Sequence, residues 1–326
     1  MRLMVTGGAG YVGGHAVRAL LDAGHEVVVF DNLVYGHAET VPCELVVGDL
    51  ADRAALDGVL GGRRFDAVLH FAAYAYVGES VTEPAKYWRN NVAAGLELLD
   101  AMRAHGVGRL VFSSTCATYG FPDRVPVTEN ESKKPESPYG ESKLTFERVL
   151  ASYARAYDLR SVSLRYFNAA GARPDGTLGE DHEPETHLIP LVLRAAAGRT
   201  EGIKVFGTDY ATPDGTCIRD YIHVDDLASA HLLALTAMER PNTTRAYNVG
   251  AGRGYSVREI IDASERVTGR GIAVEEVARR PGDPPALYAD NRKIRAELGW
   301  EPKYTDAESI VRTAWNWHAR RWGMTP

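Results

Sequence analysis

Short apolar runs alternate with stretches of helical periodicity over the first half of the chain. The runs are rich in β-branched residues, and they are "RLMVTG" (2–7), "HEVVVFD" (25–31), "CELVVGD" (43–49), "FDAVLHFAA" (65–73), "GRLVFSS" (108–114) and "RSVSLRYFN" (160–168). Helical patterns between them include "YVGGHAVRALLDAG" (11–24) and "NVAAGLELLDAMRAHG" (91–106). Because apolar strands joined by right-handed helical crossovers form a parallel sheet covered on both faces, the alternation predicts a doubly wound α/β domain.

The pattern changes after Asn168, where the segment "AAGARPDGTLGEDHEPETH" (169–187) is rich in Gly, Pro and acidic residues. We therefore expect a larger domain at 1–168 and a second, smaller α/β domain at 169–326 that binds the substrate. The run "RAYNVGAG" (245–252) again has the character of a strand. A segment near 217–251 is therefore expected to return to the main sheet, so that the two domains interleave.

Composition narrows the class of protein. The chain has 326 residues, 45% of them hydrophobic, and a formal net charge of −6, which is enough for a large core and offers no basic field for nucleic acid. No apolar run approaches a membrane span, and the first strand breaks into glycines too early for a signal peptide. Cys43, Cys116 and Cys217 are far apart, as expected of reduced thiols. We expect a cytoplasmic protein.

A glycine-rich turn follows the first predicted strand. In "TGGAGYVGG" (6–14), Gly8, Gly10 and Gly13 fit GxGxxG, and Gly7, Gly10 and Gly13 fit a GxxGxxG variant. The turn opens a helix, and Asp31 closes the second strand. This context is typical of a Rossmann sheet that binds a dinucleotide, since the glycines admit a pyrophosphate and the acid accepts from a ribose hydroxyl. A carboxylate would repel a 2′-phosphate, so NAD is favoured over NADP.

A hydroxyl cluster and a Tyr/Lys pair form the candidate catalytic group. Thr115 ends the run "RLVFSST", at the carboxyl end of a strand where open α/β sheets place ligands. Tyr139 and Lys143 are spaced i, i+4 and so share one face of a predicted helix. A tyrosinate base at neutral pH needs its pKa lowered by about three units, and a nearby lysine and a nicotinamide cation would both act in that direction. Thr115 would complete the proton relay.

These motifs resemble those of the extended short-chain dehydrogenase/reductases and, within them, the UDP-glucose/UDP-galactose 4-epimerases. The resemblance extends along nearly the whole chain and includes "VTGGAGYVGGH", "FDNL", "FSSTCATYG", "SPYGESK", "LRYFNAAGA", "GTCIRDYIHVDDLA" and "RRPGDPPALYAD". It implies NAD-dependent 4-epimerisation of a UDP-hexose by transient oxidation at C4, and a homodimer formed through helices at 92–106 and 140–156. The reaction would be redox-neutral, with NAD retained.

The resemblance also implies roles for individual residues. Tyr139 would be the base, Lys143 would bind the nicotinamide ribose, and Thr115 would stand where the family has Ser or Thr. The cofactor would be held by Gly7, Gly10, Tyr11, Val12, Gly13, Asp31, Asn32, Asp49, Leu50, Phe71, Ala72, Ala73, Asn90, Ser113, Tyr139, Lys143 and Tyr166. The UDP-sugar would be held by Thr115, Asn168, His187, Leu188, Phe206, Arg219, Tyr221, Arg280 and Asp283. From chemistry alone, Arg219 and Arg280 suit a diphosphate, although each could equally form a surface ion pair.

The chain departs from the family pattern at several positions. Ala75 stands where family members carry a lysine, His187 replaces an asparagine, and Leu287 occupies a position that gates the sugar pocket. His182 and His187 lie among glutamates, but the loop lacks helical histidine spacing, so we expect no metal.

The substrate and the reaction type leave alternatives open. UDP-xylose/UDP-arabinose and UDP-uronic acid 4-epimerases share these motifs. A nucleotide-sugar 4,6-dehydratase would need an Asp–Glu pair where this chain has Cys116 and Ala117, and a non-catalytic NAD-binding protein would usually lack the tyrosine.

Overall fold

The computed structural model describes residues 1–238, 244–280 and 282–325. The strands are β1 Arg2–Thr6, β2 Glu26–Asp31, β3 Glu44–Val47, β4 Ala67–His70, β5 Arg109–Thr115, β6 Arg160–Tyr166, β7 Asn168–Ala170, β8 Ile203–Phe206, β9 Ile218–Arg219, β10 Tyr221–His223, β11 Thr244–Val249, β12 Tyr255–Ser256, β13 Val274–Val277 and β14 Ala286–Leu287. The helices are α1 Tyr11–Asp22, α2 Arg53–Gly61, α3 Val77–Thr82, α4 Pro84–Tyr87, α5 Ala94–Ala104, α6 Pro138–Tyr157, α7 Leu188–Ala196, α8 Val224–Thr236, α9 Val257–Thr268, α10 Arg292–Leu298 and α11 Ala307–Arg321. Short 3₁₀ turns at Ala38–Thr40 and Cys116–Thr118 and a π-helical segment at Trp88–Ala93 complete the set.

The main sheet confirms the predicted doubly wound fold. Its seven strands run in the order β11-β6-β5-β4-β1-β2-β3, and every neighbouring pair is parallel. The order reverses beside β1, so the carboxyl ends of β1 and β4 border the crevice in which such sheets bind ligands. β11 lies at the edge beside β6, which brings the run "RAYNV" into this sheet.

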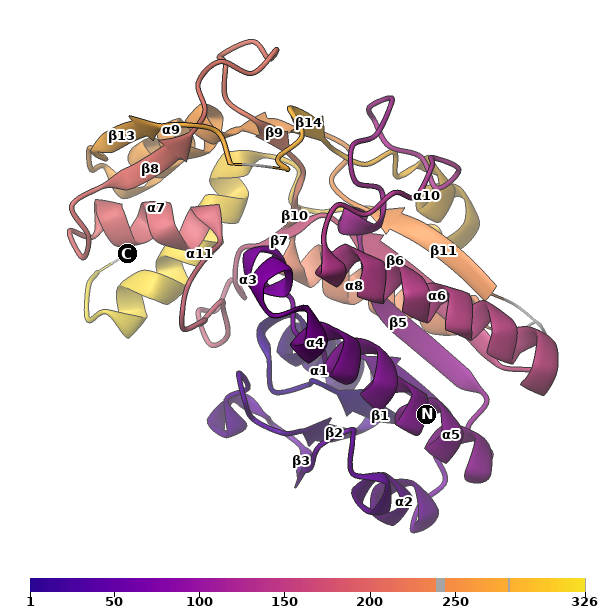
Figure 1. Ribbon diagram of the computed structural model, residues 1–326. Helices are drawn as coiled ribbons and strands as arrows, with labels where there is room; N and C mark the ends of the chain where they lie inside the picture. The colour runs from indigo at the N-terminus through magenta and orange to yellow at the C-terminus, as the bar shows by residue number, and fades with distance from the viewer. Residues whose placement is uncertain (239–243, 281, 326) are drawn as a thin grey trace.

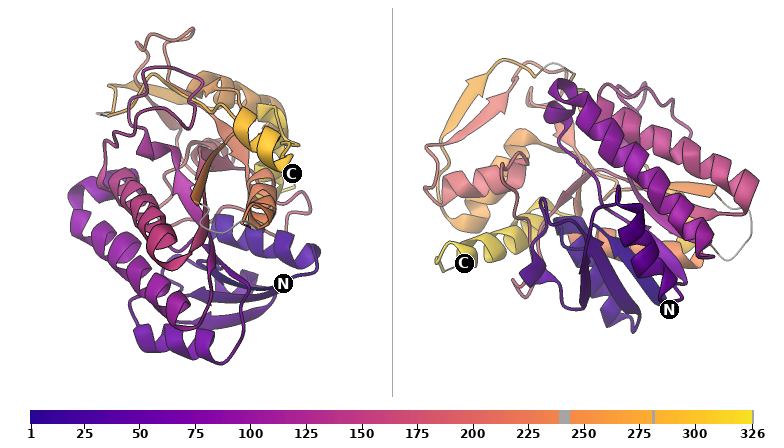
Figure 2. Two further views of the ribbon diagram at one scale, coloured as in Figure 1. Left: turned by 90° about the vertical axis from the view of Figure 1, so that its right-hand side faces the viewer. Right: turned by 60° about the horizontal axis from the view of Figure 1, so that its bottom comes forward.

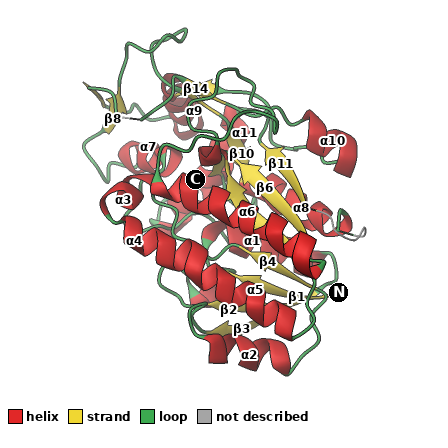
Figure 3. Ribbon diagram, turned by 45° about the vertical axis from the view of Figure 1, so that its right-hand side comes forward, coloured by secondary structure: helices red, strands yellow, loops and turns green. Residues whose placement is uncertain are grey.

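Helices cover both faces of the sheet (Figure 1; Figure 3). Alternate residues of β1 divide between the two cores, with Leu3 and Val5 on one side and Met4 on the other. The first core is closed by α1 and α8, which pack together, and the second by α2, α5 and α6. This division explains why the central strands β1 and β2 carry apolar residues on both faces and do not alternate.

A second body of structure lies beyond the carboxyl ends of these strands (Figure 2). Helices α7, α9 and α11 pack on one another there, and two small sheets accompany them: β8 with β13, and β9 between β12 and β14. The division of the chain into domains at residue 168 stays a prediction. Within the described residues, no helix is both long and apolar enough to cross a membrane.

Candidate active site

The glycine turn joins β1 to α1 at the predicted place. Gly7 has φ +74°, and a Cβ atom there would lie 2.4 Å from the backbone nitrogen of Ala72. A Cβ on Gly13 would lie 2.1 Å from the carbonyl oxygen of Gly7, whereas one on Gly10 would meet its nearest atom at 3.5 Å. Gly7 and Gly13 are therefore required by the turn itself. Gly10 caps α1 without a side-chain hydrogen bond, so the first N–H groups of this helix are available to an anion.

The carboxylate of Asp31 lies at the end of β2, next to this turn. It is buried, and its oxygens accept hydrogen bonds from the backbone N–H groups of Ala9, at 3.0 Å, and Leu33, at 2.8 Å. The amide of Asn32 donates to Asp49 at 2.8 Å, which joins the ends of β2 and β3. These acids line one edge of the crevice, and Leu50 is buried beside them.

The segment after β4 passes directly below the glycine turn. The backbone N–H groups of Phe71 and Ala72 both donate to the carbonyl oxygen of Thr6, at 2.9 and 3.1 Å, so the predicted run 71–73 lies against the end of β1. Asn90 lies in the π-helical segment and donates to the side chain of Asn91, at 2.9 Å. Asn91 in turn accepts from the backbone N–H of Tyr74, at 2.9 Å.

The hydroxyl cluster and the Tyr/Lys pair meet at the junction of β5 and α6. Ser137 caps α6 by accepting from the N–H of Gly140, at 3.2 Å, and Tyr139 lies in the first turn of this helix. Gly140 permits close approach, because a Cβ there would lie 2.6 Å from the carbonyl oxygen of Ala117. The start of α6 is thereby held against the turn that follows Thr115, which places the Tyr139 phenol near the threonine side chain.

Lys143 lies one helical turn after Tyr139 and points into the end of β5. Its Nζ atom donates to the carbonyl oxygen of Ser113 at 2.8 Å and lies 4.9 Å from the centre of the Phe112 ring. The hydroxyl of Ser113 forms a short hydrogen bond with the hydroxyl of Tyr166. The structure thus brings Thr115, Tyr139 and Lys143 into one group, with Ser113 and Tyr166 beside them.

Burial controls the electrostatics of this group. Burial raises the pKa of Tyr139 well above its usual value, the neighbouring Tyr166 adds to the rise, and among the causes of the shift only the nearby Thr115 hydroxyl opposes it. Burial also lowers the pKa of Lys143 to about 7, against a smaller opposing effect of Glu147. Lys143 is not among the groups that shift the pKa of Tyr139, so the expected lowering by the lysine and the nicotinamide cation together stays a prediction. A tyrosinate here needs another positive charge beside the phenol.

Cys116 occupies the place at which a dehydratase needs its acid. Burial raises the pKa of this thiol to about 12, and the side chain packs in an apolar cluster with Tyr119, Phe167 and Leu287. A thiol held neutral in this way supplies neither an acid nor a base at neutral pH. The geometry therefore disfavours the elimination of water.

A buried polar network lies next to the catalytic group, and the sequence analysis does not predict it. Glu147 accepts from Ser114 at 2.6 Å and pairs with Arg165, whose Nε lies 2.9 Å away. Arg165 also donates to the hydroxyl of Tyr119 at 3.0 Å, and that hydroxyl donates to Asn248 at 2.6 Å. The network joins β5, α6, β6 and β11. A signal was present, because Arg165 is a charge within an otherwise buried strand.

The predicted substrate residues lie on the elements that face the sheet from the second body. Asn168 on β7 pairs in register with Tyr221 on β10. Arg219 on β9 donates to Asp283 at 2.9 Å and to the carbonyl of Pro284 at 2.8 Å. Its side chain is largely buried, so this is no surface ion pair. The guanidinium of Arg280 lies 3.8 Å from the centre of the Phe206 ring. His187 is the N-cap residue of α7, which begins at Leu188, and its side chain makes no capping hydrogen bond.

The chain is similar to known proteins over its whole length. The model of the family described as "NAD dependent epimerase/dehydratase family" matches residues 3–250. A UDP-glucose 4-epimerase of Lacticaseibacillus casei is 48% identical over 98% of this chain and 97% of its own. The crystal structure of UDP-glucose 4-epimerase from Brucella ovis in complex with NAD has a TM-score of 0.94 and 52% identity, covering 96% of this chain and 97% of that one. The corresponding structure from Bifidobacterium longum, in complex with NAD+ and UDP, has a TM-score of 0.95 and 37% identity, with complete coverage of both chains.

Proposed function

The chain belongs to the NAD dependent epimerase/dehydratase family, and on this premise we propose that it interconverts UDP-glucose and UDP-galactose by inverting the configuration at C4 of the hexose. The observation that carries the proposal is the meeting of Thr115, Tyr139 and Lys143 at the end of β5, beside a glycine turn that is open to an anion. Relatives at about half identity, which match this chain from end to end, act on UDP-glucose.

The glycine turn and its surroundings fit a dinucleotide. The uncapped start of α1 and the open side of Gly10 would take the pyrophosphate, and Asp31 would accept from the adenosine ribose. When bound, NAD supplies a nicotinamide ring that accepts a hydride and returns it. We assign its binding to the residues inferred from the family pattern, namely Gly7, Gly10, Tyr11, Val12, Gly13, Asp31, Asn32, Asp49, Leu50, Phe71, Ala72, Ala73, Asn90, Ser113, Tyr139, Lys143 and Tyr166.

Tyr139 takes the proton from the sugar 4-hydroxyl and later returns it to the same oxygen. The hydroxyl of Thr115 lies near this phenol and would share the proton during the exchange. Lys143 is fixed on Ser113 and acts at the nicotinamide ribose. Burial raises the pKa of the phenol, and a positive charge beside it would oppose that rise. The oxidised nicotinamide would supply such a charge when it is bound, so proton removal would be favoured with the oxidised cofactor.

The UDP group is held apart from the reacting carbon. Arg219 and Arg280 offer guanidinium groups to the diphosphate, and Phe206, which stacks on Arg280, offers a flat apolar surface. Asn168, His187, Leu188, Tyr221 and Asp283 would complete this part of the site. If binding energy is concentrated on UDP, the sugar is held loosely enough to turn over between the two hydride transfers.

Two further aspects stay predictions. We propose a homodimer formed through the face of α5 and α6, which light scattering on the purified protein would test. We also propose that the protein works in the cytoplasm.

The function is tested by incubating the purified protein, without added NAD, with UDP-glucose, UDP-galactose, UDP-xylose, UDP-arabinose and UDP-glucuronic acid, and separating the products. Interconversion of the hexoses at the highest kcat/KM supports the proposal. Preferential turnover of a UDP-pentose or a UDP-uronic acid would show that this sugar is the substrate. Formation of a 4-keto-6-deoxy sugar would show that the enzyme is a dehydratase and not an epimerase.

A further inference from the structure

We propose that Glu180, His182, Glu185 and His187 bind one divalent cation of the zinc class, at a structural site outside the catalytic group. These four side chains lie in the loop between β7 and α7, and each offers one ligand atom, all within 4.8 Å of one another. The proposal goes beyond the epimerase function and does not depend on it.

The two histidines face the two carboxylates through the same ring nitrogen. Nδ1 of His187 lies 2.5 Å from Oε1 of Glu180, and Nδ1 of His182 lies 3.2 Å from the same oxygen. The second carboxylate approaches from the other side, with Glu185 oxygens 3.6 Å from Nδ1 of His187 and 3.9 Å from Nδ1 of His182. Ligands of a tetrahedral zinc ion lie about 3.4 Å apart, so small side-chain movements convert this cluster into a coordination shell.

One ligand atom in the cluster is buried without a hydrogen-bond partner. It is Oε2 of Glu185, whose side chain is only 1% exposed. The other carboxylate oxygen of Glu185 accepts from the backbone N–H groups of Thr186, at 2.7 Å, and His187, at 2.8 Å. The carboxylate is therefore held by one oxygen and presents the other to the histidines. Burying such an atom costs free energy unless a proton or a cation meets it.

The two acids of the cluster have few other partners. Glu180 and Glu185 are both buried, and the ion pairs that the described residues form with them come only from His182 and His187. A divalent cation held by all four side chains would contact both buried carboxylates.

The set of donors indicates which cation it is. Two imidazole nitrogens and two carboxylate oxygens suit Zn²⁺ and its neighbours in the first transition row, whereas Mg²⁺ and Ca²⁺ prefer six or more oxygens. Four protein ligands leave no open position for a reacting water, which is the arrangement of a structural site. Nδ1 is the coordinating atom of His187, and its other ring nitrogen remains for a contact with the substrate.

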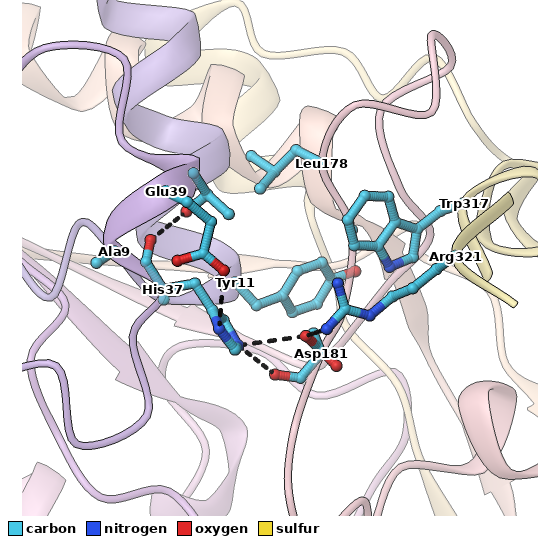
Figure 4. Close-up of a pocket in the computed structure, with 11 residues that line it drawn as sticks. Ala9, Tyr11, His37, Glu39, Leu178, Asp181, Trp317 and Arg321 are labelled. Carbon is cyan, nitrogen blue, oxygen red and sulfur yellow. Dashed lines mark hydrogen bonds and ion pairs between the residues drawn. The ribbon is translucent and has the colours of Figure 1, made fainter.

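The position of the cluster suggests what the metal stabilises. The ring of His182 packs edge-on against Tyr11, with 6.1 Å between centroids, and Tyr11 is the first residue of α1 after the glycine turn. Figure 4 shows the neighbouring contacts, in which Asp181 joins His37 to Arg321 of α11. A metal at the cluster would fix this loop between the start of α1 and the start of α7. Its removal should therefore lower stability and retention of NAD more than the chemical step.

Metal analysis of purified protein tests the proposal. The wild type, Glu185→Gln, His182→Gln and a control, Glu183→Gln, are prepared without a metal-affinity column, supplied with ZnCl₂ and dialysed. Glu183 is exposed in the same loop and lies outside the cluster. We expect about one zinc per chain in the wild type and the control, and a decrease of about tenfold or more in the other two. A wild type that retains no zinc, or equal zinc in all four proteins, would overturn the proposal.

A second measurement on the wild type does not rely on the variants folding. A chelator should lower the melting temperature and release NAD, and ZnCl₂ should restore both while MgCl₂ does not. Stability that is unchanged after the zinc has been removed would overturn the structural role. In that case the Glu180–His187 ion pair alone would hold the loop.

Discussion

Nζ of Lys143 donates to the carbonyl oxygen of Ser113 at 2.8 Å, which fixes the lysine on the end of β5, one helical turn away from Tyr139. The bond satisfies part of the ammonium group but does not neutralise it, and burial lowers the pKa of Lys143 to about 7. Burial raises the pKa of Tyr139 in the same place. Burial therefore favours the neutral form of both side chains. A positive charge beside Tyr139 would favour its phenolate, which is the form that acts as a base.

Replacing Tyr139 by Phe should lower kcat by about 100- to 10,000-fold, the usual contribution of a positioned base, while UDP binding is retained. Tyr153→Phe is the matched control, because Tyr153 lies further along α6 and its hydroxyl donates to Asp100. The measurement is turnover of UDP-galactose together with the Kd for UDP by calorimetry. Near-normal epimerisation by the Tyr139→Phe protein would contradict the assignment of the base.

The buried lysine gives the stability a defined pH dependence. Its folded pKa lies near 7, below the unfolded value of about 10.4, so between these values the unfolded chain binds the extra proton and stability rises with pH. The unfolding free energy of the wild type minus that of Lys143→Met should rise between about pH 7 and about pH 9.5, by about 1 kcal/mol or more. It is measured by urea unfolding at both pH values.

Lys293→Met is the control for this comparison, because Lys293 also donates to a backbone carbonyl, that of Ala246 at 2.9 Å, but in a more exposed place. The rise with pH should be larger for Lys143→Met than for this control. If the two differences change equally with pH, the ammonium of Lys143 is not held in a desolvated site.

Two glycines of the turn should differ in what they are required for. Gly13 is needed for the fold of the turn, and Gly10 for the approach of the cofactor. Gly13→Ala forces a Cβ to within 2.1 Å of a backbone oxygen, so it should lower both stability and NAD content. Gly10→Ala meets nothing closer than 3.5 Å, so it should leave stability unchanged and lower NAD content alone. The wild type should purify with about one NAD per chain.

NAD is measured in the supernatant after denaturation, and stability by thermal unfolding of each protein. Gly58→Ala is the control, because a Cβ there meets no atom within 4 Å. Full NAD content in Gly10→Ala would show that the pyrophosphate does not approach this glycine, and NADP in the supernatant would contradict the role of Asp31.

The Glu147–Arg165 pair should be needed for stability although it touches no reacting atom. Both side chains are about nine-tenths buried, so Glu147→Gln leaves a buried guanidinium uncompensated and should cost about 3–5 kcal/mol. Glu97→Gln, in a surface pair with Arg53, should cost less than about 1 kcal/mol. The free energy of unfolding of both variants is measured with a chemical denaturant. Equal losses in the two variants would show that the Glu147–Arg165 pair is solvated.

The sheet and the glycine turn could be predicted because their signals are local. Each apolar run is bounded by turn residues, and the glycines stand at fixed offsets from a strand and a helix. The network of Glu147, Arg165 and Asn248 could not be predicted, because its members are 18 and 83 residues apart along the chain and meet only after β6 and β11 pair.

The cluster of Glu180, His182, Glu185 and His187 shows a different limit. The sequence predicts no metal there because the spacing of the histidines is not helical, but the loop folds back and brings Glu180 and Glu185 against them. Spacing is informative only where the backbone is regular. In an irregular loop, the burial of the carboxylates is the better signal, and burial there cannot be predicted from the sequence.

The width of the sugar pocket should depend on Leu287. It pairs in register with Arg219 and packs with Cys116, directly after Thr115, so it stands between the diphosphate residues and the catalytic group. Leucine is shorter than tyrosine and carries no hydroxyl, which leaves more room beside C2 of the sugar. We expect measurable but not preferred turnover of UDP-GlcNAc and UDP-GalNAc, because one small apolar change in a pocket is worth only about 1–3 kcal/mol.

Leu287→Tyr should therefore lower kcat/KM for UDP-GalNAc by about tenfold or more relative to UDP-galactose. The ratio of the two substrates is the measurement, since a loss of folded protein would reduce both activities equally. Leu287→Met keeps the volume of the side chain and should leave the ratio unchanged. Leu287 is mostly buried, so its alternative role is that of a core residue turned away from the sugar. An unchanged ratio in Leu287→Tyr, with both activities reduced, would establish that alternative.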